Sequence, residues 1–139
     1  MQPPTDEEPI QVLHIDDDRS FLKSAKKCLN LQGDFVIESA SSVDEAFEKM
    51  TKKKPDVIIC DVNMPGTDGF EFLKALRESN YNVPFIVFTV TGDKETARKA
   101  FNAGANGFVG KSGETKVVFS LLKEQIEKAV NDSGEMKNL

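Results

Sequence analysis

The sequence is poor in the residues that build metal and redox centres. It has two cysteines, Cys28 and Cys60, and a single histidine, His14. The cysteines form no C-x-x-C pair and no second histidine stands near them, which argues against a zinc site. Both cysteines lie in apolar stretches, and we interpret them as buried thiols of a protein in a reducing compartment.

Long apolar runs and an excess of basic residues are also missing. No run approaches the roughly 20 apolar residues that span a bilayer. The N-terminus, MQPPTDEEPI, is acidic where a signal peptide is basic and then apolar. We therefore expect a cytoplasmic protein. The formal net charge of −5 argues against nucleic acid and against an anionic membrane surface as partners.

The length of 139 residues suits one domain that buries its core without disulfides or metals. We expect a flexible, polar and acidic leader over 1–9, a folded domain over 10–130, and a frayed tail or the start of a linker over 131–139. No second domain is expected after the last helix, so we expect either a stand-alone module or a piece of a larger protein.

Apolar strands alternate with amphipathic helices along the domain. Strands are predicted at 10–15, 35–40, 57–60, 84–88 and 106–109. Helices are predicted between Asp18 and Gly33, from Ser42 past Met50, from about Phe70 to Asn80, between Asp93 and Gly104, and from about Glu114 to Val130. This alternation predicts an α/β fold with a parallel sheet and helices on both of its faces.

Polar residues follow four of the predicted strands. They are Asp16, Asp17 and Asp18 after the first strand, Asp61 after the third, Thr89 after the fourth and Lys111 after the fifth. Because ligands gather at the carboxyl ends of parallel strands, we expect these side chains at one rim of the sheet. Clustered carboxylates repel one another, and Mg²⁺ would relieve this while leaving room for a phosphoryl oxygen. A carboxylate can also act as a nucleophile toward phosphorus.

Each of these residues has a commoner structural role when it is considered alone. An aspartate after a strand is usually a helix cap or a turn residue. Thr89 alone is a β-branched strand end, Lys111 a surface lysine and His14 a strand residue. The functional interpretation depends on several such residues arriving together at the expected ends of their strands.

These motifs resemble those of response-regulator receiver domains of the CheY-like class, over about residues 10–130. The resemblance is carried by I-D-D-D at 15–18, D-V-I-I-C-D-V-N-M-P-G-T-D-G at 56–69, P-F-I-V-F-T at 84–89 and G-A-N-G-F-V-G-K at 104–111. It implies a flavodoxin-like three-layer sandwich whose five-stranded parallel sheet has the order 2-1-3-4-5, with five helices on both faces. It also implies a module of a two-component phosphorelay that receives phosphoryl from a histidine kinase or phosphotransfer domain.

The resemblance implies a chemical role for each rim residue. Asp61 is the implied phosphoacceptor, and Thr89 and Lys111 are the implied ligands of the phosphoryl oxygens. Thr89 and Phe108 form the implied switch. That switch remodels the face made by the fourth helix, fifth strand and fifth helix, where an output protein or domain, or a second copy of the chain, would dock.

The resemblance also implies Mg²⁺ as the cofactor. Its implied ligands are Asp16, Asp17, Asp61 and the backbone carbonyl of Asn63. Asp17 is expected to bind the ion directly and Asp16 partly through water.

Two positions depart from the family's pattern. Ser112 follows Lys111 where the family usually has proline joined by a cis bond. Since a cis bond before a non-proline residue costs about 2.5–4 kcal/mol, we expect either a trans bond with a shifted loop or a strained cis bond. Val90 follows Thr89 where the family mostly has alanine or glycine, so we expect narrower access to Asp61.

Two alternative functions are weighed against a phosphoryl-accepting receiver. A degenerate receiver that only binds proteins is disfavoured by the intact rim residues. A phosphatase of the aspartyl-phosphate type is disfavoured because Asn63, two residues after Asp61, cannot protonate a leaving group. We expect a signalling receiver and not an enzyme, with only self-phosphorylation and slow autodephosphorylation, the latter tuned by Asn63 and Thr91.

Overall fold

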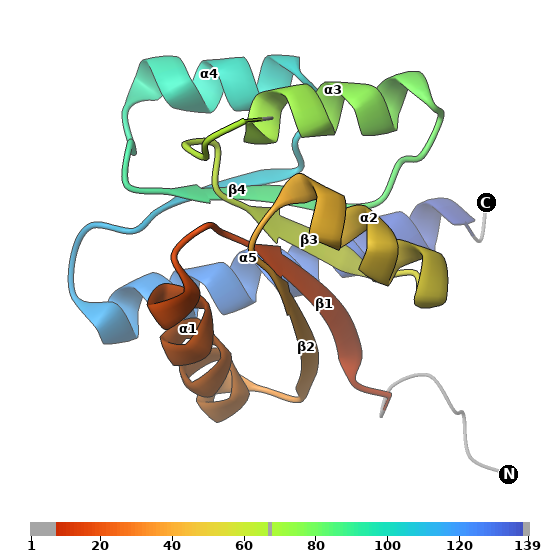
Figure 1. Cartoon of the computed structure of the whole chain (residues 1–139). Coiled ribbons are helices and arrows are strands. Elements are labelled where there is room, and N and C mark those ends of the chain that lie inside the picture. The colour runs from red at the N-terminus through yellow and green to blue at the C-terminus, as the bar shows by residue number, and fades with distance from the viewer. Residues whose placement is uncertain (1–7, 67, 138–139) are drawn as a thin grey trace, which may run out of the picture.

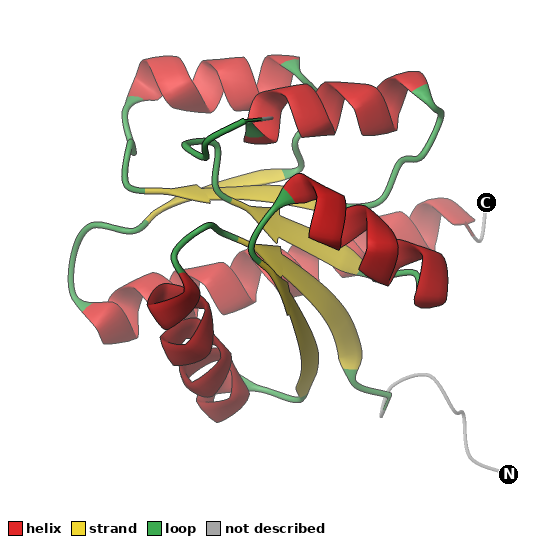
Figure 2. Cartoon of the chain, viewed as in Figure 1, coloured by secondary structure: helices red, strands yellow, loops and turns green. Residues whose placement is uncertain are grey.

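Five strands and five helices alternate along the chain in a computed structural model that describes residues 8–66 and 68–137 (Figures 1 and 2). The strands are β1 (Ile10–Ile15), β2 (Phe35–Ala40), β3 (Val57–Cys60), β4 (Phe85–Thr89) and β5 (Gly107–Gly110). The helices are α1 (Arg19–Gln32), α2 (Val43–Lys52), α3 (Gly69–Glu78), α4 (Lys94–Asn102) and α5 (Thr115–Lys137).

The strands form one parallel sheet in the order β2-β1-β3-β4-β5. Helices α1 and α5 cover one face of this sheet, and α2, α3 and α4 cover the other (Figure 1). The predicted three-layer α/β sandwich and its strand order are therefore confirmed. All four strand pairs are parallel, so every strand ends at the same edge of the sheet.

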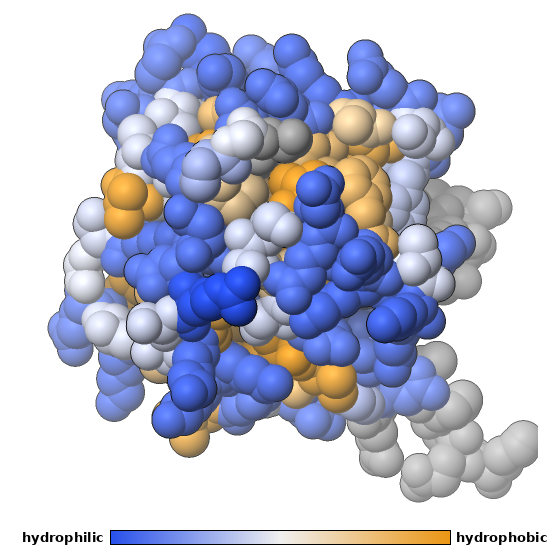
Figure 3. All heavy atoms as spheres, viewed as in Figure 1, coloured by the Kyte–Doolittle hydropathy of each residue, from blue (hydrophilic) through white to orange (hydrophobic). Residues whose placement is uncertain are grey.

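Two hydrophobic cores lie on opposite faces of the sheet. Successive side chains of a strand point to opposite faces, so Ile58 joins the core under α2, α3 and α4, while Ile59 joins the core against α1 and α5. Strands β3 and β4 are buried along their whole length. The face in Figure 3 is mostly hydrophilic, with small separate hydrophobic areas.

Side-chain caps fix where four of the helices begin. In each case the cap oxygen accepts a hydrogen bond from the backbone N–H three residues further on; the caps are Asp18, Ser42, Asp68 and Asp93. Such caps typically contribute about 1 kcal/mol each. The commoner structural role of an aspartate after a strand therefore applies to Asp18, whose carboxylate caps α1.

The observed boundaries differ from the predicted ones mainly at the ends. Helix α5 continues to Lys137, although residues 131–137 were expected in a frayed tail. That segment, NDSGEMK, lacks a regular apolar pattern, so the sequence carried no sign that the helix propagates through it. Strands β4 and β5 each begin and end one residue later than predicted. Within the predicted leader, residues 1–7 lie outside the described part of the chain.

The structure tests the expected burial of the two cysteines and the expected lack of a membrane-spanning segment. Cys60 is fully buried, whereas Cys28 is only partly buried, so the interpretation as a buried thiol holds for Cys60 alone. Of the helices in the described ranges, none is both long enough and apolar enough to cross a membrane.

The outer edge of β5 is closed by a side chain of α5. The Gln125 side chain accepts a hydrogen bond from the Phe108 N–H at 2.9 Å and donates one to the Phe108 carbonyl at 3.2 Å. An edge strand otherwise presents unpaired backbone groups to solvent or to another chain. A Cβ atom at Gly107 would clash with the Gln125 side-chain oxygen, so the glycine lets that oxygen lie where the Phe108 N–H donates to it.

We predict that Gln125→Leu lowers the free energy of unfolding by about 1–3 kcal/mol, because it leaves the Phe108 N–H and carbonyl without partners. Urea unfolding of the full chain measures this loss. The neighbouring exposed position supplies the control, since Glu124→Leu should change stability by about 0.5 kcal/mol or less. Equal losses in the two variants would contradict the proposed edge closure.

Candidate functional site

The polar residues predicted at the ends of four strands lie together at the carboxyl-terminal edge of the sheet. Backbone hydrogen bonds carry the strand pairing one residue past the strand ends. The Asp16 N–H donates to the Ala40 carbonyl at 3.0 Å, and the Asp61 N–H donates to the Ile15 carbonyl at 3.0 Å. The Lys111 N–H donates to the carbonyl of Thr89 at 2.8 Å. The backbone at these positions is thus fixed by the sheet itself.

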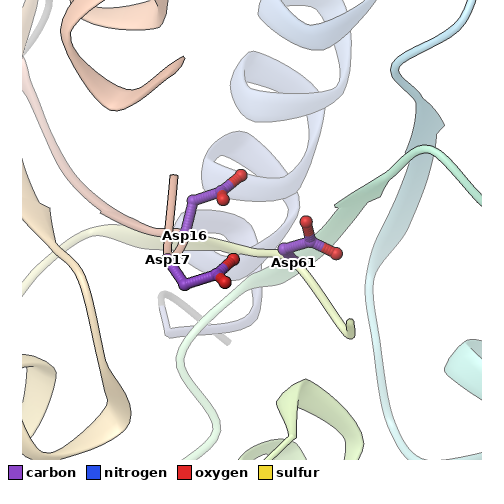
Figure 4. A group of neighbouring side chains, drawn as sticks. All are labelled: Asp16, Asp17 and Asp61. Atoms are coloured by element: carbon purple, nitrogen blue, oxygen red, sulfur yellow. The ribbon is translucent and has the colours of Figure 1, made fainter. Parts of the chain in front are cut away.

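Three carboxylates form the acidic part of the site. Figure 4 shows Asp16 and Asp17 from the loop after β1 beside Asp61 from the end of β3. One oxygen from each lies within 4.8 Å of the others. Asp16 and Asp61 are buried, and Asp17 is exposed. Hard oxygen donors in this number suit a cation such as Mg²⁺, so the residues fit the cofactor that the sequence predicts.

Lys111 bridges two of these carboxylates. Its ammonium donates to Asp16 Oδ2 at 2.6 Å and to Asp61 Oδ2 at 2.8 Å, and its side chain is 12% exposed. Burial lowers the pKa of Lys111, but the hydrogen bonds and charges of the two aspartates outweigh it and raise that pKa. Burial raises the pKa of Asp16, against the hydrogen bonds from Lys111 and from the Asp18 N–H. The ammonium therefore stays charged between the two carboxyl groups.

The second oxygen of Asp61 is held by Asn63. The Asn63 N–H donates to Asp61 Oδ1 at 2.9 Å. The amide of the same residue donates to Thr89 Oγ1 at 3.1 Å and to Thr91 Oγ1 at 2.8 Å. Thr89 is fully buried. Its hydroxyl is connected to Asp61 through the hydrogen bonds of Asn63. Asn63 thus links Asp61 to Thr89.

A glycine lets α3 begin directly against the backbone of Asp61. A Cβ atom at Gly69 would lie 2.5 Å from the Asp61 carbonyl oxygen and 2.9 Å from the Cα of Val62. Only a residue without a side chain fits there. The sequence motif contains this glycine, but its role in the close packing of α3 against the end of β3 depends on tertiary structure that the motif alone does not show.

The structure resolves one of the two departures from the family pattern. The Lys111–Ser112 bond is trans, and the described residues contain no cis peptide bond. The strained cis alternative is therefore wrong for this structure. Val90 is 62% exposed next to the buried Thr89. Its predicted effect on access to Asp61 stays a prediction.

Phe108 lies on the β5 side of the site. Its ring is partly buried and packs against the core under α2, α3 and α4. Its backbone is clamped by Gln125 from α5, as described above. The residue therefore touches the elements on which the predicted switch depends.

The single histidine is buried beneath the site. His14 lies in β1, as expected of a strand residue, and neither ring nitrogen has a hydrogen-bond partner among the described residues. Its ring centroid lies 6.0 Å from those of Phe21 and Phe88. Burial, together with the nearby charge of Lys111, lowers the pKa of His14 to about 3. Sequence reasoning missed this aromatic cluster, because its members are spread over β1, α1 and β4.

A family model described as the response regulator receiver domain matches residues 12–123. Among curated proteins, the response regulator MprA of Mycolicibacterium vanbaalenii is 26% identical over 126 residues, which cover 91% of this chain and 54% of that protein. The nitrate/nitrite response regulator NarL of Escherichia coli is 31% identical over 121 residues, which cover 86% of this chain and 56% of that protein. The chain thus spans about half the length of these relatives.

A solved structure agrees in fold as well as in sequence. The chemotaxis protein CheY4 of Vibrio cholerae superposes with a TM-score of 0.73 at 32% identity. The match covers 84% of this chain and 98% of that one.

We predict that the buried His14 makes stability fall in mild acid. Its folded pKa lies below the unfolded value of about 6.5, so the unfolded chain binds the extra proton and stability falls as the pH drops from about 6.5 toward 3. His14→Phe should remove this contribution. The difference in unfolding free energy between the two proteins should change by about 2 kcal/mol between pH 7 and pH 5.

Urea unfolding at both pH values, with a chelator present, measures this difference. Other titrating groups are common to both proteins and cancel in the comparison. Stability curves that run parallel between pH 7 and pH 5 would contradict a buried neutral His14.

Proposed function

The chain belongs to the response regulator receiver domain family, whose members are phosphoryl-accepting signalling modules of two-component systems, and we propose that Asp61 is its phosphoacceptor. A histidine kinase or phosphotransfer domain would supply the phosphoryl group. The observation that carries the proposal is the Lys111 ammonium, which hydrogen-bonds Asp61 and Asp16 at the rim of the sheet. It places a fixed positive charge where the negative charge of a transferred group would arrive.

In the proposed reaction an oxygen of Asp61 forms a bond to phosphorus. The bond from phosphorus to the donor's imidazole nitrogen breaks, and the imidazole leaves as the neutral group after protonation. Lys111 and the Thr89 hydroxyl would bind the phosphoryl oxygens. The chain then contributes position and charge to the transfer and little covalent chemistry of its own.

Mg²⁺ is proposed as the cofactor, held by Asp16, Asp17, Asp61 and the backbone carbonyl of Asn63. When bound, the ion would neutralise phosphoryl oxygens on the side opposite Lys111. The exposed carboxylate of Asp17 supports direct ligation by that residue. Asp16 already accepts from Lys111 and from the Asp18 N–H, which supports a contact partly through water.

The output of the proposed switch would be the face of α4, β5 and α5. Phosphorylation would draw in Thr89 and move Phe108, which lies on β5. Three exposed apolar residues support docking at this face: Phe101 on α4, with Val117 and Leu121 on α5. The proposed partners there are an output protein or domain, or a second copy of this chain. Neither nucleic acid nor a membrane is proposed as a partner of this acidic domain, and its cytoplasmic location remains a prediction.

Two alternatives have less support. A receiver used only for binding would not need a charged lysine held between Asp16 and Asp61 at a buried site. A phosphatase would need a general acid beside Asp61. Such enzymes carry that acid two residues after the nucleophile, and here this position is Asn63, whose amide donates to two threonines and cannot protonate a leaving group. We therefore propose self-phosphorylation and slow autodephosphorylation as the only catalytic activities.

We predict that incubation with acetyl phosphate and Mg²⁺ adds one phosphoryl group to the full chain, and that Asp61→Asn abolishes the labelling. Intact-protein mass spectrometry followed by borohydride trapping of the acyl phosphate locates the site. Asp18→Asn is the matched control, because its carboxylate only caps α1 and asparagine caps equally well. Labelling should also disappear with a chelator. Retention of labelling in Asp61→Asn would refute the assignment.

We predict that Val90→Ala speeds labelling by a bulky donor more than by a small one. A smaller side chain at this exposed rim position would widen the approach to Asp61. The measurement compares initial labelling rates with acetyl phosphate and with phosphoramidate, and the expected change is in the ratio of the two rates. Unchanged rates with both donors would show that Val90 does not restrict access.

A further inference from the structure

The geometry points to a second residue that governs the reactive lysine. We propose that Phe21 is a positioning residue for Lys111, and that its aromatic face holds the ammonium at the site. The inference rests on the proposed function for its effect on phosphoryl transfer. The contact itself is independent of that function.

The ammonium of Lys111 lies over two aromatic rings. Its nitrogen is 4.5 Å from the ring centroid of Phe21 and 5.7 Å from that of Phe88. Both distances lie within the range of a cation–π interaction. The same ammonium donates to Asp16 and Asp61. It is therefore held by carboxylates and by an aromatic surface at once.

The position of Phe21 is fixed by its own surroundings. Its backbone N–H donates to the capping oxygen of Asp18 at 3.0 Å, in the first turn of α1. Its ring centroid lies 5.6 Å from that of Phe88, on β4, and 6.4 Å from that of Phe119, on α5. His14 meets it edge-on at 6.0 Å. The ring is thus packed against residues of three other elements, which hold it in a fixed position beside the lysine.

Because Lys111 is largely buried, its ammonium depends on contacts such as that with the Phe21 ring. With 12% of the side chain exposed, the ammonium has lost most of its water, and each lost contact must be replaced. Two carboxylates replace part of this solvation, and the negative face of an aromatic ring replaces another part. Ser112 follows Lys111, so no proline ring restrains the loop that carries the lysine. Side-chain contacts therefore do more of the positioning.

An electrostatic role for the ring can be separated from simple packing by stepwise fluorination. Fluorine withdraws charge from the ring face and weakens a cation–π contact, with little change in ring size. We expect the rate of Asp61 labelling by acetyl phosphate and the affinity for beryllofluoride with Mg²⁺ to fall stepwise along a mono-, di- and trifluorophenylalanine series at position 21. The total decrease should be about three- to tenfold.

Conventional variants extend the same test. Phe21→Leu should resemble the trifluorinated protein, and Phe21→Tyr should stay within about twofold of the original chain, because it keeps the aromatic face. The matched control is the same fluorinated series at Phe119, which packs against Phe21 and Phe88, whereas the cation–π contacts of the ammonium are with Phe21 and Phe88 themselves. Labelling should not change along that series. Urea unfolding confirms that each protein remains folded.

A direct probe covers the case in which Asp61 does not accept phosphoryl. Protons on Cε of Lys111 should show an upfield ring-current shift in NMR spectra of the full chain without donor or metal, and Phe21→Leu should reduce that shift to the smaller contribution of the more distant Phe88 ring. If the original chain fails to label, the proposed function fails, and the NMR shift alone decides the role of Phe21. Rates that stay constant along the position-21 series, equal losses along the Phe119 series, or an unshifted Lys111 would each overturn the inference.

Discussion

Lys111 carries a single positive charge that two buried carboxylates share, with contacts of 2.6 Å to Asp16 and 2.8 Å to Asp61. Asp16 is only 1% exposed, and an uncompensated charge at such a place would cost several kcal/mol. The lysine thus offsets most of the destabilisation that two buried carboxylates would cause in the folded protein. It cannot balance three carboxylates, however, because Asp17 adds a further negative charge nearby. The remaining charge suits a divalent cation, and the lysine suits a phosphoryl group.

This ion-pair geometry depends on the parallel sheet. Asp61 and Asp16 lie side by side because β3 pairs directly with β1, and Lys111 arrives from β5 across β4. The backbone hydrogen bonds that extend past the strand ends fix the main chain of these residues without any contribution from side chains. Gly69 then allows α3 to start against the backbone of Asp61. The rim residues are therefore positioned by the same backbone contacts that build the sheet and place α3.

The sequence predicted most of this arrangement, because the relevant signals are local or periodic. Apolar runs located the five strands, and single polar residues after them located Asp61, Thr89 and Lys111. What the sequence could not predict depends on side chains that meet from distant segments. Phe21 beneath Lys111 is one example, and the clamp of Gln125 on Phe108 is another. The continuation of α5 past Val130 was missed for a different reason, since its polar end carries no periodic signal.

Asn63 joins the two halves of the site in a way that bears on switching. Its N–H holds one oxygen of Asp61, while its amide occupies the hydroxyls of Thr89 and Thr91. Thr89 is the acceptor in its contact with the Asn63 amide, so its O–H stays able to donate to a phosphoryl oxygen on the proposed phosphoacceptor Asp61. A hydrogen bond to an ionised oxygen is stronger than one between neutral groups. A charge event on Asp61 can therefore bias the position of Thr89.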